Sequence, residues 1–207
     1  IYTRGNGYWI WKPYIILNTL INIANECDIV CYCDAGAWWN NTAKPLWYWT
    51  SQTKYGVMMF NHGLTGGAWI QDKEKSMNLS DNVWTKRDAF ILLGVDIQEM
   101  KNTVIRKATY SCYQKNPDSI HFVTEWLYHS MDERAISDME PSIGVEINEF
   151  VENRHDQSIM SLLSKKYGIP AFSEPSQYGR GDSLIYGSAF VNHWEKPWII
   201  KHTRGKQ

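Results

Sequence analysis

One carboxylate, Asp34, stands where a β-sheet would present it to a ligand. It follows the apolar run of residues 28–33 and precedes Ala35 and Gly36, a pattern typical of a buried parallel strand that ends in a polar residue. Ligands of open α/β sheets bind at this carboxyl edge. The pattern therefore favours a binding site at Asp34. A carboxylate that only caps the turn after the strand is the alternative.

Two further groups of polar side chains stand at the starts of predicted helices. Lys86 and Arg87 open one helix, and because a helix amino terminus favours anions, either cation is placed to contact one. A solvated charged turn is the alternative for both. His155, Asp156 and Gln157 open another helix, where Asp156 is either a functional carboxylate or an ordinary N-cap.

The elements that must position these groups alternate along the chain. Apolar periodicity and capping residues predict helices over 13–26, 85–93, 119–131 and 156–167, and strands over 28–33, 56–60 and 103–113. Long irregular segments separate some of them. The order predicts one mixed α/β domain whose loops carry the functional side chains.

Composition narrows the class of protein. The 207 residues include 21 Lys and Arg and 22 Asp and Glu, for a net charge of −1, so nucleic acid and anionic membranes are not expected partners. With 43% hydrophobic residues and 11 Trp the chain is not disordered. Polar residues interrupt its most apolar stretch, so no membrane span is expected. The four cysteines are too few for a disulfide scaffold and are expected to be reduced thiols.

Four strings occur along the chain in a recognisable order. They are GYWIWKPYIIL at 7–17, DAG at 34–36, TKRD at 85–88 and RHDQS at 154–158. Together they resemble the sugar transferases of capsule and lipopolysaccharide loci and of large DNA viruses, which are similar to nucleotide-diphospho-sugar transferases of the GT-A fold. The first and last strings carry the resemblance, which covers most of the chain.

The resemblance implies a GT-A-like architecture, a mixed and mostly parallel sheet flanked by helices. Residues 1–207 would form a single transferase domain. GT-A domains begin with a βαβ unit that recognises the nucleotide base, whereas the first clear element here is the helix before Asp34. An N-terminally truncated domain is therefore expected. The resemblance also implies a cytoplasmic protein, in a bacterium or in the host of a virus.

The donor site implied by the resemblance uses one carboxylate and four cations. Asp34 would bind the donor, and the cations directed at its diphosphate would be Lys12, Lys86, Arg87 and Arg204. A Lys offers a point charge to a phosphate or a sugar hydroxyl. A surface lysine beside the helix start is the alternative for Lys12, and a charged tail the alternative for Arg204.

A divalent ion, Mn²⁺ or Mg²⁺, is the implied cofactor. In GT-A enzymes two carboxylates of a DxD motif end this strand, and the ion that they hold neutralises the leaving diphosphate. Here Asp34 is the first carboxylate and Gly36 takes the place of the second. Asp34 and His202 are the expected metal ligands, with His193 competing for the role of His202; cationic side chains that replace the ion are the alternative.

The catalytic residues implied by the resemblance are His155, Asp156 and Gln157. They resemble the HDE and DQD motifs of two retaining transferase families. Asp156 would bind the acceptor, and Gln157 would lie near the reacting face. Because an amide is a poor nucleophile, the motif favours retention by a front-face path over double displacement.

The expected function is transfer of a sugar from a nucleotide-diphosphate donor to a glycan or lipid-linked acceptor. Two alternatives remain. A carbohydrate-binding module would use the many tryptophans as flat faces for sugar rings, and an inactive transferase remnant would explain the missing first unit. A binding module has no need of acids at a strand end and a helix start that converge on one cleft, so that convergence discriminates between them.

Overall fold

A four-stranded sheet forms the centre of the computed structural model, which describes residues 4–61, 78–176 and 199–202. The strand order is β1-β4-β3-β5, with bounds Ile29–Cys33 (β1), Arg106–Gln114 (β4), Val57–Asn61 (β3) and Ala171–Phe172 (β5). The protein is thus mixed α/β, as expected. The expected mostly parallel sheet is wrong, because β4 is antiparallel to both β1 and β3 and only β3 with β5 is parallel.

Strand β1 shows why the direction was mispredicted. It lies at the edge of the sheet and is only partly buried, whereas its apolar run predicted a strand buried between parallel neighbours. An apolar run predicts a strand without specifying its direction, which depends on how the chain returns to the sheet. Beyond β1, the chain forms a second, two-stranded sheet in which β2, Ala37–Trp39, pairs with β6, Ile200–His202.

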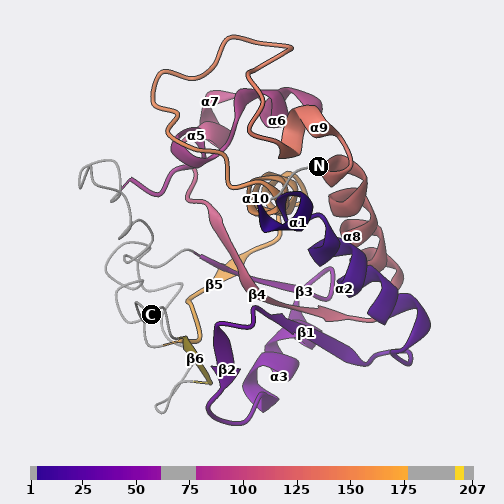
Figure 1. Ribbon diagram of the computed structural model, residues 1–207. Helices are drawn as coiled ribbons and strands as arrows, with labels where there is room; N and C mark the ends of the chain where they lie inside the picture. The colour runs from indigo at the N-terminus through magenta and orange to yellow at the C-terminus, as the bar shows by residue number, and fades with distance from the viewer. Residues whose placement is uncertain (1–3, 62–77, 177–198, 203–207) are drawn as a thin grey trace.

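Helices cover both faces of the central sheet (Figure 1). The helices α2 (Trp11–Asn22), α8 (Pro117–Ser130) and α10 (Asp156–Lys166) pack together on one face, and α3 (Lys44–Gln52) packs on the other. Short helices complete the described structure: α1 (Gly5–Tyr8), α5 (Asp81–Trp84), α6 (Arg87–Leu92), α7 (Gln98–Lys101) and α9 (Glu133–Ile136).

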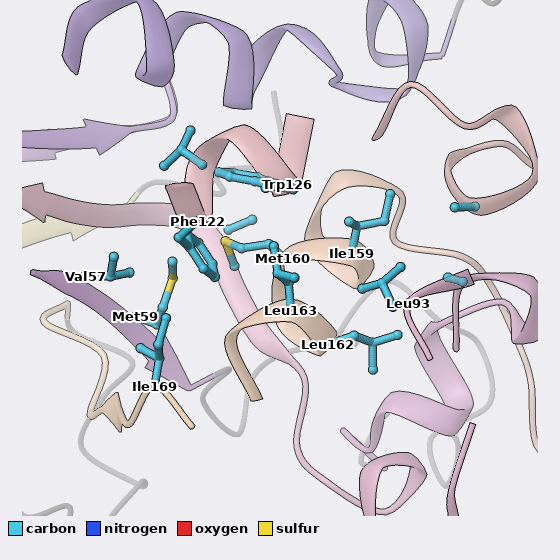
Figure 2. Close-up of a cluster of buried hydrophobic side chains, with 14 of the residues drawn as sticks. Val57, Met59, Leu93, Phe122, Trp126, Ile159, Met160, Leu162, Leu163 and Ile169 are labelled. Carbon is cyan, nitrogen blue, oxygen red and sulfur yellow. The ribbon is translucent and has the colours of Figure 1, made fainter. Parts of the chain in front are cut away.

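The main core lies between the sheet and the face covered by three helices. Val57 and Met59 of β3 point into it, toward Phe122 and Trp126 of α8 and the apolar side of α10 (Figure 2). The alternate residues of β3, Met58 and Phe60, belong to a second cluster with Leu46 of α3. Because every residue of β3 is buried, this strand is the centre of both hydrophobic layers.

The four predicted helices are confirmed, with shifts at their ends. The first helix, predicted over 13–26, ends four residues earlier, at Asn22. At residues 85–93, α6 begins two residues later than predicted, at Arg87, and Thr85 is the extended residue that follows α5. Thr85 therefore does not cap this helix, because Lys86 takes the N-cap position without a side-chain cap. Asp88 instead accepts hydrogen bonds from the backbone and hydroxyl of Ser142, at 2.7 and 2.9 Å.

Two of the four cysteines are joined in a disulfide, so the expectation of four reduced thiols is wrong. Cys31 of β1 and Cys112 of β4 are direct partners in the antiparallel register, and their Cα atoms lie 4.2 Å apart. Local sequence does not indicate this pairing, because the two residues are 81 positions apart. Disulfides are rare in cytosolic proteins, so the pairing gives no support to a cytoplasmic location, which stays a prediction.

Thiol titration is expected to distinguish the two free cysteines. Cys27 is exposed, whereas burial raises the pKa of Cys33 to about 11, so only about 0.1% of Cys33 is thiolate at pH 8. In the native protein a disulfide reagent should titrate Cys27 rapidly and Cys33 slowly. After denaturation two thiols should react, and after reduction four; four thiols in the unreduced protein would contradict the disulfide.

Within the residues that the structure describes, no helix is long and apolar enough to cross a membrane.

Candidate functional site

Five of the sequence-predicted site residues line one cavity. Its volume is about 160 Å³, and among its lining residues are Lys12, Asp34, His155, Asp156 and Gln157. The first turn of α2, the end of β1 and the start of α10 supply them. These elements are distant in sequence and meet because α2 and α10 lie on the same face of the sheet (Figure 1).

The Lys12 ammonium is the centre of the cavity's polar network. Its Nζ lies 3.2 Å from Asp156 Oδ2 and 3.5 Å from Asp34 Oδ1, and it donates to the Ala108 carbonyl of β4 at 3.2 Å. Asp34 Oδ1 also accepts a 2.6 Å hydrogen bond from the Tyr32 hydroxyl. One buried cation thus fixes two carboxylates that come from different elements.

The two carboxylates differ in exposure, and burial changes the pKa of Asp156. The Asp34 side chain is 37% exposed and the Asp156 side chain 4%. Burial raises the pKa of Asp156 to about 6, against the opposing effect of Lys12. Burial also lowers the pKa of Lys12, but its two carboxylates outweigh this, and its pKa lies above the ordinary value. The cavity therefore holds the Lys12 ammonium, the accessible side chain of Asp34 and a buried carboxyl group, Asp156, that titrates close to neutrality.

Strained backbone lies at the same cavity, which Trp9 and His155 line. His155 has φ 55° and ψ −119°, and Tyr8 and Trp9 have φ values of 56° and 61°, which are unfavourable for residues with a Cβ. Their rings pack together, because His155 stacks on Tyr8 at 4.7 Å and lies 5.5 Å from Trp9. Strain of this kind costs of order 1–3 kcal/mol per residue and clusters at functional sites.

The remaining contacts of the helix start hold His155 and Gln157 in place. Burial lowers the pKa of His155, so its ring is neutral at pH 7, and Nδ1 donates to the Ile136 carbonyl at 2.7 Å. Its buried Nε2 has no hydrogen-bond partner in the described part of the chain. The Gln157 amide donates to the Arg106 carbonyl at 2.8 Å. Both side chains are therefore fixed before any ligand binds.

Two arginines that the sequence analysis did not single out also line the cavity. Arg4 ion-pairs with Asp138 and Glu152, and Arg154 lies 3.5 Å from Glu152 and packs its guanidinium over the Trp84 ring. Arg154 is the first residue of the RHDQS string, which was the signal available for it. Nothing around Arg4 marked it. Together they add two guanidinium groups to the cavity, which suits an anionic ligand.

Lys86 and Arg87 do not reach this cavity. Arg87 binds Asp96 through Nε and Nη2, at 3.4 and 3.1 Å, and its Nη1 donates to the Val145 carbonyl. Lys86 is 2% exposed and lines a different cavity. The structure therefore gives no support to either cation as a contact of the same ligand as Asp34.

The C-terminal candidates are only partly described. The backbone of His202, at the end of β6, pairs with Ala37, three residues beyond Asp34, which brings this strand near the cavity. Arg204 and His193 lie outside the described residues.

The residues around Asp34 make a poor divalent-metal site. Gly36 offers no side chain, and both Tyr32 and Lys12 occupy Asp34 Oδ1. The ammonium of Lys12 lies beside both carboxylates, where a second cation would be repelled. Over residues 4–61, 78–176 and 199–202 no group of three or more His, Cys, Asp or Glu side chains could hold a metal. The donor set fits an ammonium-centred site better than the Mn²⁺ or Mg²⁺ that the resemblance implies.

Comparison with known proteins adds no assignment, because no family model, curated protein or solved structure matches this chain.

Proposed function

We propose that the protein transfers a sugar from a nucleotide-diphosphate donor to a glycan or lipid-linked acceptor, with retention at the anomeric carbon. The observation that carries the proposal is the single cavity lined by Lys12, Asp34 and residues 155–157. The same residues are those that the resemblance assigns to donor and catalysis. At about 160 Å³ the cavity suits a sugar ring or a phosphate group, and the rest of the donor would lie on open surface.

The proposed roles follow from exposure and charge. Asp34, with its exposed carboxylate, accepts hydrogen bonds from donor hydroxyls, and Arg4 and Arg154 face the diphosphate. Asp156, buried and ionised above pH 6, stabilises the positive charge that develops at the anomeric carbon. The carbon–oxygen bond to the diphosphate breaks with its electron pair on the diphosphate. The acceptor hydroxyl then attacks the same face, and its proton passes to a leaving phosphate oxygen.

Calorimetric titration with a panel of nucleotide sugars tests the proposal. At least one donor should bind, and with an acceptor present proton NMR of the fresh product should show the donor's anomeric configuration. An inverted product would disprove retention. If no nucleotide sugar binds while free glycans do, the protein is a binding module and the proposal is wrong.

EDTA tests whether the donor site needs a metal, and Lys12→Met tests the effect of Lys12 on Asp156. The resemblance predicts Mn²⁺ or Mg²⁺ in the donor site, whereas we propose that the Lys12 ammonium takes the place of the ion. EDTA should therefore change donor affinity less than about twofold. Lys12→Met should move the acid limb of the pH–rate profile upward, because Lys12 lowers the pKa of Asp156. Exposed Lys44 provides the matched control, Lys44→Met. Strong loss of donor binding in EDTA would show that the donor site uses a divalent ion.

Exposed tryptophans favour the carbohydrate-binding alternative as a second candidate. Trp38 and Trp39 of β2 and Trp47 of α3 are between 43% and 45% exposed, and such faces stack on sugar rings. Under this alternative Trp47→Ala should weaken glycan binding, whereas Asp34→Ala should leave it unchanged.

A further inference from the structure

A second cavity adjoins the first, on the side of the segment that follows α9. Its volume is about 280 Å³, and it is lined by Lys86 and by residues between 137 and 153. Two of its acids, Asp138 and Glu152, ion-pair with Arg4, which lines the first cavity. The two cavities therefore share a wall of charged side chains.

Two buried polar atoms of this cavity's lining have no hydrogen-bond partner within the described ranges. The Lys86 side chain is fully buried, and its ammonium has no hydrogen-bond partner among the described residues. Glu146 accepts from the backbone amides of Arg87 and Ile147 through Oε1, at 2.9 and 3.0 Å, but its buried Oε2 has no partner there either. Buried polar groups left in this way cost free energy, and in native proteins they are normally satisfied.

The charge of the lining disfavours phosphate as the missing partner. Arg4 ion-pairs with Asp138 and Glu152, but the carboxylates of Glu140 and Glu146 also line the cavity beside the one ammonium of Lys86, and they would repel an anion. A neutral hydroxyl group meets both requirements, because it accepts a hydrogen bond from an ammonium and donates one to a carboxylate. Phe150 adds an aromatic side chain to the lining, and aromatic rings pack against the apolar face of a sugar.

We propose that this second cavity binds a neutral sugar ring, one of whose hydroxyls accepts from Lys86 Nζ and donates to Glu146 Oε2. Its identity as the acceptor's sugar rests on the proposed function, since the wall shared through Arg4 places it next to the donor cavity. Binding of a neutral sugar does not depend on that function.

The test uses ligand-observed NMR and calorimetry with the methyl glycosides of glucose, galactose, mannose and N-acetylglucosamine. At least one should bind the wild-type chain, and both Lys86→Met and Glu146→Gln should weaken it at least about tenfold, the effect of one hydrogen bond to a charged group. Exposed Lys44 and Glu99 supply matched controls, Lys44→Met and Glu99→Gln, which should bind normally. Glu146→Gln preserves shape if Lys86→Met does not fold.

Several outcomes would overturn the inference. These are no glycoside binding at tens of millimolar, glycoside binding that both variants leave unchanged, and inorganic phosphate binding that Lys86→Met abolishes. The two proposals fail separately. Glycoside binding that depends on Lys86, without binding of any nucleotide sugar, would refute the transferase and support this site. Nucleotide-sugar binding without glycoside binding that depends on Lys86 would refute this site alone.

Discussion

Asp34→Ala is expected to abolish sugar transfer and donor hydrolysis, leaving less than about 1% of wild-type turnover. Asp34 supplies the cavity's accessible carboxylate, and Tyr32 and Lys12 hold it in one orientation. No other side chain of the cavity offers an exposed acid, within the part of the chain that the structure describes. Turnover and donor affinity measured with saturating acceptor provide the readout.

The fold should survive the change at Asp34. Its side chain is 37% exposed, and without it the buried Lys12 ammonium still pairs with Asp156, so the melting temperature should move by only a few degrees. Glu26→Ala, at an exposed acid just before β1, is the control and should be fully active. Tyr32→Phe removes the hydroxyl that orients Asp34 and should give an intermediate loss. Full activity of Asp34→Ala at saturating donor would show that the donor site lies elsewhere.

Helices were the part of the fold that local sequence predicted well. The apolar spacing along α8 and α10 reports the face that each buries, so both were located to within a few residues. The direction of a strand in a sheet is not determined by local sequence. The run before Asp34 is apolar because β1 covers helix α2 on one side, yet its antiparallel partner β4 begins more than seventy residues later. The Cys31–Cys112 disulfide was missed for the same reason.

Site residues next to a strand end or a helix start are predictable from the local sequence. Contacts between segments that are distant in sequence are not. Asp34 and Asp156 were identified from their positions at a strand end and a helix start, and the structure brings them to the same ammonium. The prediction that Lys86 contacts the donor rests on its position at a helix start and on the resemblance. In the structure Lys86 lines a cavity with acidic side chains instead. These acids lie between residues 138 and 152, where the sequence predicts no helix or strand.

Asp156→Asn is expected to lower turnover about 100-fold or more with little change in donor affinity, because its proposed partner is the transition state. Asparagine keeps the shape, and Lys12 retains Asp34 and the Ala108 carbonyl. Asp81→Asn is a matched control at a buried carboxylate that pairs with Lys165. It should lower the melting temperature, by loss of a buried pair, without a comparable loss of turnover in the folded fraction. Loss of donor binding in Asp156→Asn would move Asp156 to the nucleotide site.

The pH dependence of turnover should carry the signature of the same carboxylate. With burial raising the pKa of Asp156 to about 6, turnover should fall about tenfold per pH unit below that value. The folded-state pKa lies above the ordinary 3.8, so between these values the folded protein binds the proton more tightly than the unfolded chain does. Asp156 therefore opposes folding above pH 6 and ceases to do so as the pH falls. Acid should thus remove activity near pH 6 while the melting temperature holds. Asp156→Asn should lack this acid limb, and a limb that persists in the variant would assign it to another group.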